Sequence, residues 1–111
     1  SYGHAKDFFD VTLASGALNP RRNLYQYRNG SGVLPGEGDL LVYNASASNH
    51  YGHVAIVTMV DPEQKFIEII QQNAGPHSAS RKRHALVFEQ GSWKVKNARI
   101  LGWLSLNAPA P

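Results

Sequence analysis

One histidine and two side-chain amides could act together in acid–base chemistry. His53 lies near the start of a run of mostly β-branched residues that predicts a strand over 52–60. The returning strand is predicted over 66–73 and carries Gln71 and Asn73 at its end. Side chains alternate between the two faces of a strand, so both amides share one face. An imidazole beside an amide oxygen supplies the base and the orienting group of a nucleophile–base–orienter arrangement.

The pairing of the two strands decides which amide meets the histidine. A loop over 61–65 would place His53 opposite Asn73, whereas a loop over 61–63 would place it opposite Gln71. In both registers the rest of that face is apolar and comprises Ala55, Val57, Met59, Ile67 and Ile69. The residues alone leave a structural role open, because a single histidine often serves packing and strand-end amides often form turns.

Composition limits the chemistry. The 111 residues include no cysteine, which excludes a disulfide framework, a cysteine zinc site and a cysteine nucleophile within the chain. The five histidines lack the spacing of a metal site, so we expect no metal and no other cofactor. No apolar stretch approaches the roughly 20 residues of a membrane span, so we expect no membrane partner. The absence of cysteine does not decide between a secreted, cell-wall-associated and a cytoplasmic location.

The chain is mildly basic, with a net charge of +3. Its densest basic cluster is Arg81-Lys82-Arg83-His84, which we place in a loop. Such a cluster is commonly solvated surface, and its functional interpretation is contact with an anionic substrate or polymer. Dedicated nucleic-acid binders carry a denser basic stripe, so nucleic acid is not an expected partner.

The remaining patterns predict an α+β fold of one domain over 1–106, with its sheet core at about 35–104 and a tail or linker at 107–111. A short N-terminal helix is expected over 5–14, and turn signals predict a loop over 17–38. The sheet is expected to be mostly antiparallel, with five to six strands. These strands are predicted at 39–43, 52–60, 66–73, 83–89, 93–95 and 99–104.

Four segments in order carry a family resemblance. They are Pro-Gly-Glu-Gly-Asp-Leu-Leu-Val-Tyr at 35–43, Gly-His-Val-Ala-Ile-Val at 52–57, Ile-Gln-Gln-Asn at 70–73 and Ile-Leu-Gly-Trp-Leu at 100–104. Together they resemble the CHAP family of cysteine, histidine-dependent amidohydrolases and peptidases, which has a papain-like core related to the NlpC group. Within that family the chain is most similar to the amidase domain of glutathionylspermidine synthetase/amidase. The resemblance implies a papain-like CHAP core and hydrolysis of an amide bond in peptidoglycan, another peptide-like substrate or glutathionylspermidine.

The resemblance also implies roles for the three polar residues. His53 matches the general base of the family and Asn73 matches an asparagine of the returning strand. Gln71 stands where the family usually has glutamate, and an amide cannot stabilise an imidazolium as a carboxylate would. The family nucleophile is a cysteine at the start of a helix, which is absent from these residues. We expect it either upstream of residue 1 or lost from the lineage.

A missing nucleophile helix would leave the apolar face of the hairpin without cover. We expect that cover to come from a second polypeptide carrying the cysteine, from a second copy of the chain, or from residues 5–14 folded back. One alternative function is a catalytically inactive CHAP-like module for binding or scaffolding. Another is a polymer-binding domain that uses residues 81–84, whose binding would fall steeply with salt.

Overall fold

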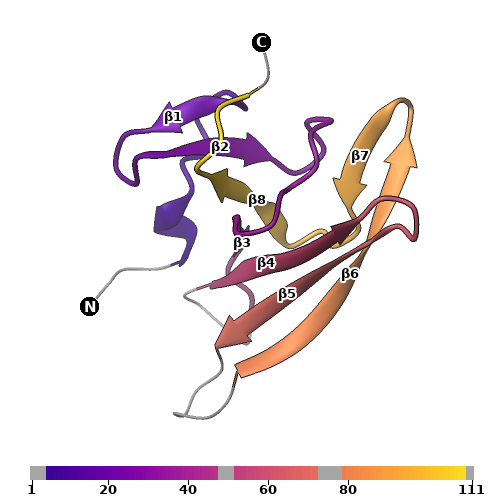
Figure 1. The fold of residues 1–111 in the computed structure, drawn as a ribbon. Coiled ribbons are helices and arrows are strands. Elements are labelled where there is room, and N and C mark those ends of the chain that lie inside the picture. The colour runs from indigo at the N-terminus through magenta and orange to yellow at the C-terminus, as the bar shows by residue number, and fades with distance from the viewer. Residues whose placement is uncertain (1–4, 48–51, 73–78, 110–111) are drawn as a thin grey trace.

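The structure is a computed structural model that describes residues 5–47, 52–72 and 79–109 (Figure 1). Its described strands form one eight-stranded antiparallel sheet in the order β1-β2-β8-β3-β4-β5-β6-β7. The elements are η1 (Ala5–Phe8), β1 (Ala17–Asn19), β2 (Leu24–Arg28), β3 (Leu40–Tyr43), β4 (His53–Asp61), β5 (Phe66–Gln72), β6 (Ala79–Glu89), β7 (Ser92–Val95) and β8 (Ile100–Ser105). No helix in these described ranges is long and apolar enough to cross a membrane.

The sheet curls around the main hydrophobic core. Six inter-strand spacings of about 4.8 Å separate β2 from β7 in the strand order. Nevertheless, the side chain of Asn29, directly after β2, donates to the carbonyl of Val95 in β7 at 3.0 Å and accepts from its N–H at 2.9 Å. A flat sheet could not bring these two residues into contact, so the concave face must close over its own side chains. Figure 1 shows this strong twist, with the β6–β7 hairpin standing beside β8.

This closure buries the apolar face of the β4–β5 hairpin, as expected. Its buried members Ala55, Val57, Ile67 and Ile69 are at most 2% exposed. The cover comes from the chain's own strands on the concave side, including β2, β7 and β8. Residues 5–14 do not supply it, because Phe9 packs with Val42 and Leu104 in a second cluster on the opposite face.

The expected helix over 5–14 is wrong. Only one 3₁₀ turn, Ala5–Phe8, forms there, and the chain then turns at Asp10. The buried amide of Gln26 takes both backbone groups of Asp10, because its Oε1 accepts from the Asp10 N–H and its Nε2 donates to the Asp10 carbonyl. The Asp10 carboxylate in turn accepts from the backbone N–H and the hydroxyl of Thr12. These bonds replace those that a continuing helix would need.

Two other expectations about segments are also wrong. The predicted loop over 17–38 contains β1 and β2, which raises the strand number from the expected five to six to eight. β2 is stabilised by pairing with β8, a partner about 75 residues away along the chain. The basic cluster at 81–84 lies within strand β6 and not in a loop. Alternation along β6 therefore places Lys82 and His84 on one face and Arg81 and Arg83 on the other.

The β4–β5 hairpin contains a bulge that the sequence did not predict. Ile56 pairs with Ile70, which is the register expected from a loop over 61–65, but the register shifts by one residue between Val57 and Met59. The shift turns Met59 outward, where it is 39% exposed, and brings Val60 against the core in its place. The expected membership of Met59 in the apolar face is therefore wrong, because a bulge reverses the alternation beyond it.

Candidate functional site

His53 begins β4 at the end of the hairpin that lies away from the bulge. It pairs with Tyr43 of β3, so the two side chains share a face of the sheet. Their ring centroids lie 4.8 Å apart at an angle of 51°. The Tyr43 ring is buried and thereby forms a fixed wall against one side of the half-buried imidazole.

Gln71 of β5 contacts the imidazole, although the strands do not have the register from which that pairing was expected. Its Oε1 is hydrogen-bonded to Nε2 of His53. An amide oxygen can only accept, so Nε2 of His53 carries the proton and Nδ1 holds the lone pair. The contact is diagonal, because the pairing of Ile56 with Ile70 is the register expected from a loop over 61–65 and Gln71 is not directly opposite His53 in that register. Asn73 itself lies outside the described residues.

A second histidine, missed by the sequence analysis, lies in the same region. Nε2 of His84 on β6 is 2.6 Å from the hydroxyl of Tyr43. Burial raises the pKa of Tyr43. Burial lowers the pKa of His84, and the nearby charges of Lys82 and His53 lower it further. Both shifts favour the neutral forms, so the Tyr43 hydroxyl donates to Nε2 of His84 and the ring proton of His84 lies on Nδ1.

The alternation of residues along the strand indicates on which face His84 lies. Leu86 is buried on the core face of β6, and residues 84 and 82 precede it at the period of a strand. The predicted strand over 83–89 already contained His84, and carrying its alternation from Leu86 back to residue 82 would have placed both His84 and Lys82 on the core face.

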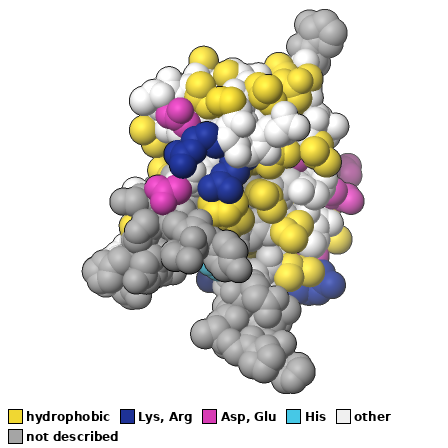
Figure 2. All heavy atoms as spheres, turned by 90° about the vertical axis from the view of Figure 1, so that its left-hand side faces the viewer, with side chains coloured by type: hydrophobic (Ala, Val, Ile, Leu, Met, Phe, Trp, Pro, Cys, Tyr) yellow, Lys and Arg dark blue, Asp and Glu magenta, His cyan; other side chains and the backbone are white. Residues whose placement is uncertain are grey.

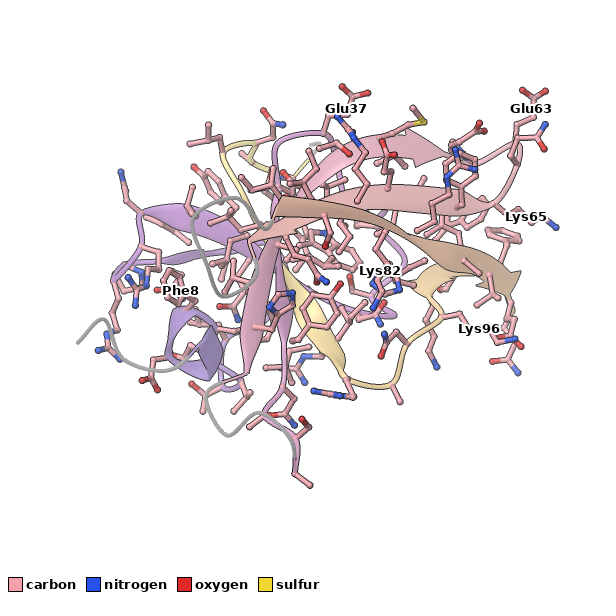
Figure 3. The ribbon with its side chains drawn as sticks, turned by 90° about the horizontal axis from the view of Figure 1, so that it is seen from below. Phe8, Glu37, Glu63, Lys65, Lys82 and Lys96 are labelled. Carbon is pink, nitrogen blue, oxygen red and sulfur yellow. The ribbon has the colours of Figure 1, made fainter. Side chains whose placement is uncertain are left out.

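These side chains surround one pocket of about 240 Å³. It is lined by Tyr43, His53, Gln71, Lys82, His84, Asn97 and Arg99. Lys82 extends from β6 into the space between β6 and β8, as seen from below in Figure 3. Asn97 and Arg99 come from the turn that leads into β8. The pocket therefore combines four neighbouring strands, β3 to β6, with the turn before β8.

Asp39, the acidic residue before β3, has a structural position away from this pocket. It is 5% exposed, and its Oδ2 accepts a hydrogen bond from the backbone N–H of Gly36. Its carbonyl accepts from the N–H of Val57, which ties the start of β3 to β4. Burial raises the pKa of the carboxyl, whereas the bonds from Gly36 and Ser105 lower it.

In the part of the chain that the structure describes, no three His, Asp or Glu side chains converge as metal ligands. The polar residues of the pocket therefore provide an oriented imidazole, a buried tyrosine–histidine pair and two cations. They can accept a proton, donate hydrogen bonds and attract negative charge.

A comparison with protein families decides the relationship. The family model for the CHAP domain matches residues 2–73. The chain belongs to the CHAP domain family. CHAP members are cysteine amidases with a papain-like core, and this chain has no cysteine. The matched residues include His53 and Gln71, whereas Lys82, His84, Asn97 and Arg99 lie beyond them. No curated protein matches the chain.

Proposed function

We propose that the chain is the base-bearing part of a CHAP-type amide hydrolase whose nucleophilic cysteine lies outside these 111 residues. The hydrogen bond between His53 Nε2 and Gln71 Oε1 carries the proposal, because it orients an imidazole at a pocket and both of its residues lie within the family match. The cysteine would come from a further segment of the natural polypeptide, from a second polypeptide or from a second copy that carries one.

The proposed reaction uses His53 first as a base and then as an acid. Nδ1 takes the thiol proton of the cysteine, and the thiolate attacks the amide carbonyl. When the C–N bond breaks, the imidazolium returns that proton to the leaving amine and a thioester remains. His53 then deprotonates a water molecule, which hydrolyses the thioester and releases the carboxylic acid and the thiol.

Gln71 acts in this scheme as a positioning residue. Its amide oxygen keeps the proton on Nε2 and thereby keeps Nδ1 basic. As a neutral group it stabilises the transient imidazolium less than a carboxylate would. Asn73 is a second candidate for this role, because it matches the family asparagine.

The proposed substrates are amide bonds of the kinds associated with the family. Peptidoglycan cross-bridges and N-acetylmuramoyl-alanine bonds are the first choice, and the glutathionylspermidine amide is the small-molecule alternative. A catalytically inactive module for binding or scaffolding is a second candidate function, favoured by the absence of cysteine from the chain.

The test compares the 111-residue chain with the natural polypeptide in which it occurs. Both are assayed with purified peptidoglycan and with glutathionylspermidine, before and after treatment with a thiol-alkylating reagent. We expect no turnover by the chain alone and alkylation-sensitive turnover by the natural polypeptide. Turnover by the chain alone that resists alkylation would exclude the cysteine mechanism. Peptidoglycan binding without turnover by either protein would favour the binding module.

A further inference from the structure

The pocket beside His53 contains two cationic side chains and no carboxylate. Lys82 and Arg99 line it. All 8 Asp and Glu side chains of the chain fall within the described ranges, and none of them lines this pocket. On the side of the molecule drawn in Figure 2, by contrast, basic and acidic side chains lie next to one another. The pocket therefore concentrates positive charge without an internal counter-ion.

Arg81, the residue before Lys82, has a carboxylate partner that compensates its charge. Arg81 lies on the opposite face of β6, and its guanidinium is 3.3 Å from the carboxylate of Glu68. Lys82 lines the pocket together with His84, whose pKa is lowered first by burial and then by the charge of Lys82.

The hydrogen-bonding groups of the pocket also favour an anion. Two of its acceptors are engaged internally, because Gln71 Oε1 bonds His53 and His84 Nε2 bonds Tyr43. The Asn97 side-chain oxygen accepts from the backbone N–H of Arg99 at 3.0 Å, so the amide nitrogen of Asn97 remains as a donor.

The turn that carries these donors is fixed at several points. The N–H of Ile100 bonds the Asn97 carbonyl at 3.0 Å. The Arg99 carbonyl accepts from the N–H of Asn44 at 2.7 Å, which ties the turn to the end of β3. Arg99 therefore starts from a backbone held in place before any ligand arrives, which reduces the ordering cost of binding.

We propose that this pocket binds a carboxylate of the substrate, next to the amide bond on which His53 acts. A guanidinium presents paired N–H groups that match the two oxygens of a carboxylate, and an ammonium adds a point charge beside it. The volume of about 240 Å³ suits a small acidic or carboxyl-terminal residue better than a polymer segment. The position of this carboxylate next to a reacting amide bond rests on the proposed function. Binding of the carboxylate itself requires no catalysis.

The test is a titration of the ¹⁵N-labelled chain at low salt, followed by NMR chemical shifts. The matched probes are N-acetyl-L-alanyl-L-alanine and its carboxyl-terminal amide, with inorganic phosphate as a third titrant. Binding of the free acid should be weak, on the order of millimolar, because both cations are exposed to solvent. We expect the carboxamide to bind at least fivefold more weakly than the acid and phosphate to bind no more tightly than the acid.

Charge-removing variants locate the binding. Lys82→Met and Arg99→Met should each weaken binding of the acid at least threefold, and together at least tenfold. Arg81→Met is the matched control, because it removes the same net charge from the other face of β6, and it should change binding less than twofold. The chemical-shift dispersion of the same spectra verifies that each variant is folded. If a methionine variant is not folded, Lys82→Gln or Arg99→Gln takes its place.

Four results would overturn the proposal. They are equal binding of the acid and the carboxamide, tighter binding of phosphate, an equal loss in Arg81→Met, and the absence of saturable binding. Each can be observed without turnover, so failure of the carboxylate site is distinguishable from failure of the hydrolase assignment. Conversely, saturable binding of the free acid by a protein without hydrolase activity would support the carboxylate site and contradict the proposed hydrolysis.

Discussion

The hydroxyl of Tyr43 lies 2.6 Å from Nε2 of His84 in the wall of the pocket. This bond joins β3 to β6, which are separated by β4 and β5 in the sheet. Both partners are buried, so each loses its access to water and depends on the other for its hydrogen bond. The pair therefore ties two distant strands together beneath the site of His53.

Removing this hydroxyl should destabilise the fold. We expect Tyr43→Phe to lower the free energy of unfolding by about 1–3 kcal/mol, because the buried Nε2 of His84 loses its donor. Urea denaturation measures the change. Tyr25→Phe is the control, since Tyr25 is only partly buried, and should cost less than about 0.5 kcal/mol. Equal stability of Tyr43→Phe and the parent chain would show that the bond contributes nothing.

The stability of the chain should fall as the pH decreases through about 6.5. The folded-state pKa of His84 is lowered, so below the unfolded value of 6.5 the unfolded chain binds a proton that the folded chain rejects. This site contributes at most about 1.4 kcal/mol per pH unit, and the contribution ends below its folded-state pKa. His84→Gln keeps an acceptor for Tyr43 and should flatten the dependence of unfolding free energy on pH between 7 and 5.5.

The quantity to compare is the pH dependence of the unfolding free energy in the parent chain and in His84→Gln, because Lys82 and His53 lie near residue 84 in both proteins. Asp39 acts in the opposite direction, since its raised pKa makes the folded chain bind the extra proton just above pH 3.8. Repeating the measurement on an Asp39→Asn background removes that contribution. An unchanged slope in His84→Gln would show that the pH dependence has another origin.

How far the sequence predicted the site depended on how far each contact reaches along the chain. His53 and Gln71 lie on one hairpin, so the strand period was sufficient to place them on the same face, whereas the register expected to pair them directly was wrong. Residues 81–84 were considered as a contact for an anion, but the position of Lys82 and His84 beside His53 was missed, because consecutive basic residues conceal the alternation of a strand. Arg99 was missed because only the insertion of β8 beside β3 brings its turn to the pocket.

The same argument accounts for the errors in the fold. β2 is only five residues long and lies between the turn signals Asn19-Pro20 and Asn29-Gly30, and its strand conformation depends on pairing with β8. The segment after Phe8 has amphipathic spacing, but the amide of Gln26 binds the backbone of Asp10 and ends any helix. The bulge near Thr58 has no proline or glycine to announce it, so the reversal at Met59 could not be predicted from residue types.

His53→Ala should abolish most of the hydrolysis by the natural polypeptide while leaving its fold intact. Loss of a positioned general base typically costs about 10²–10⁴ in rate. The thermal midpoint should change little, because His53 is only half-buried at the start of a strand. Steady-state kinetics and thermal unfolding are measured on the same preparations. Gln64→Ala, an exposed change in the adjoining turn, is the control and should leave both unchanged.

Gln71 offers a substitution in each direction. Gln71→Ala should reduce kcat about 10- to 100-fold without a matching rise in KM, because the imidazole loses the partner that fixes its tautomer. Gln71→Glu should restore or exceed the parent rate, since a carboxylate stabilises the imidazolium better than an amide. A Gln71→Glu rate as low as that of Gln71→Ala would contradict the positioning role.

Gly102 of β8 should tolerate no side chain. A Cβ there would lie 2.0 Å from the Tyr27 carbonyl and 2.7 Å from the Phe9 ring. We expect Gly102→Ala to lower the free energy of unfolding by about 3 kcal/mol or more, as overpacking against backbone does. Gly36→Ala is the matched control, because its nearest atom would be 3.8 Å away. Similar urea midpoints for the two variants would refute the close approach.

The central position of β8 has a consequence for synthesis on the ribosome. β8 is the last strand of the sheet to be translated, yet it lies between β2 and β3 and contributes Trp103 to the middle of the core. Until it emerges, the nascent chain has two separate groups of strands, each with an open edge facing the other. The β3–β7 meander can pair as it appears, whereas β1 and β2 must wait for the final segment. Folding therefore becomes complete only after translation of this domain is nearly finished, and until then its exposed edges are targets for chaperones and for misassociation.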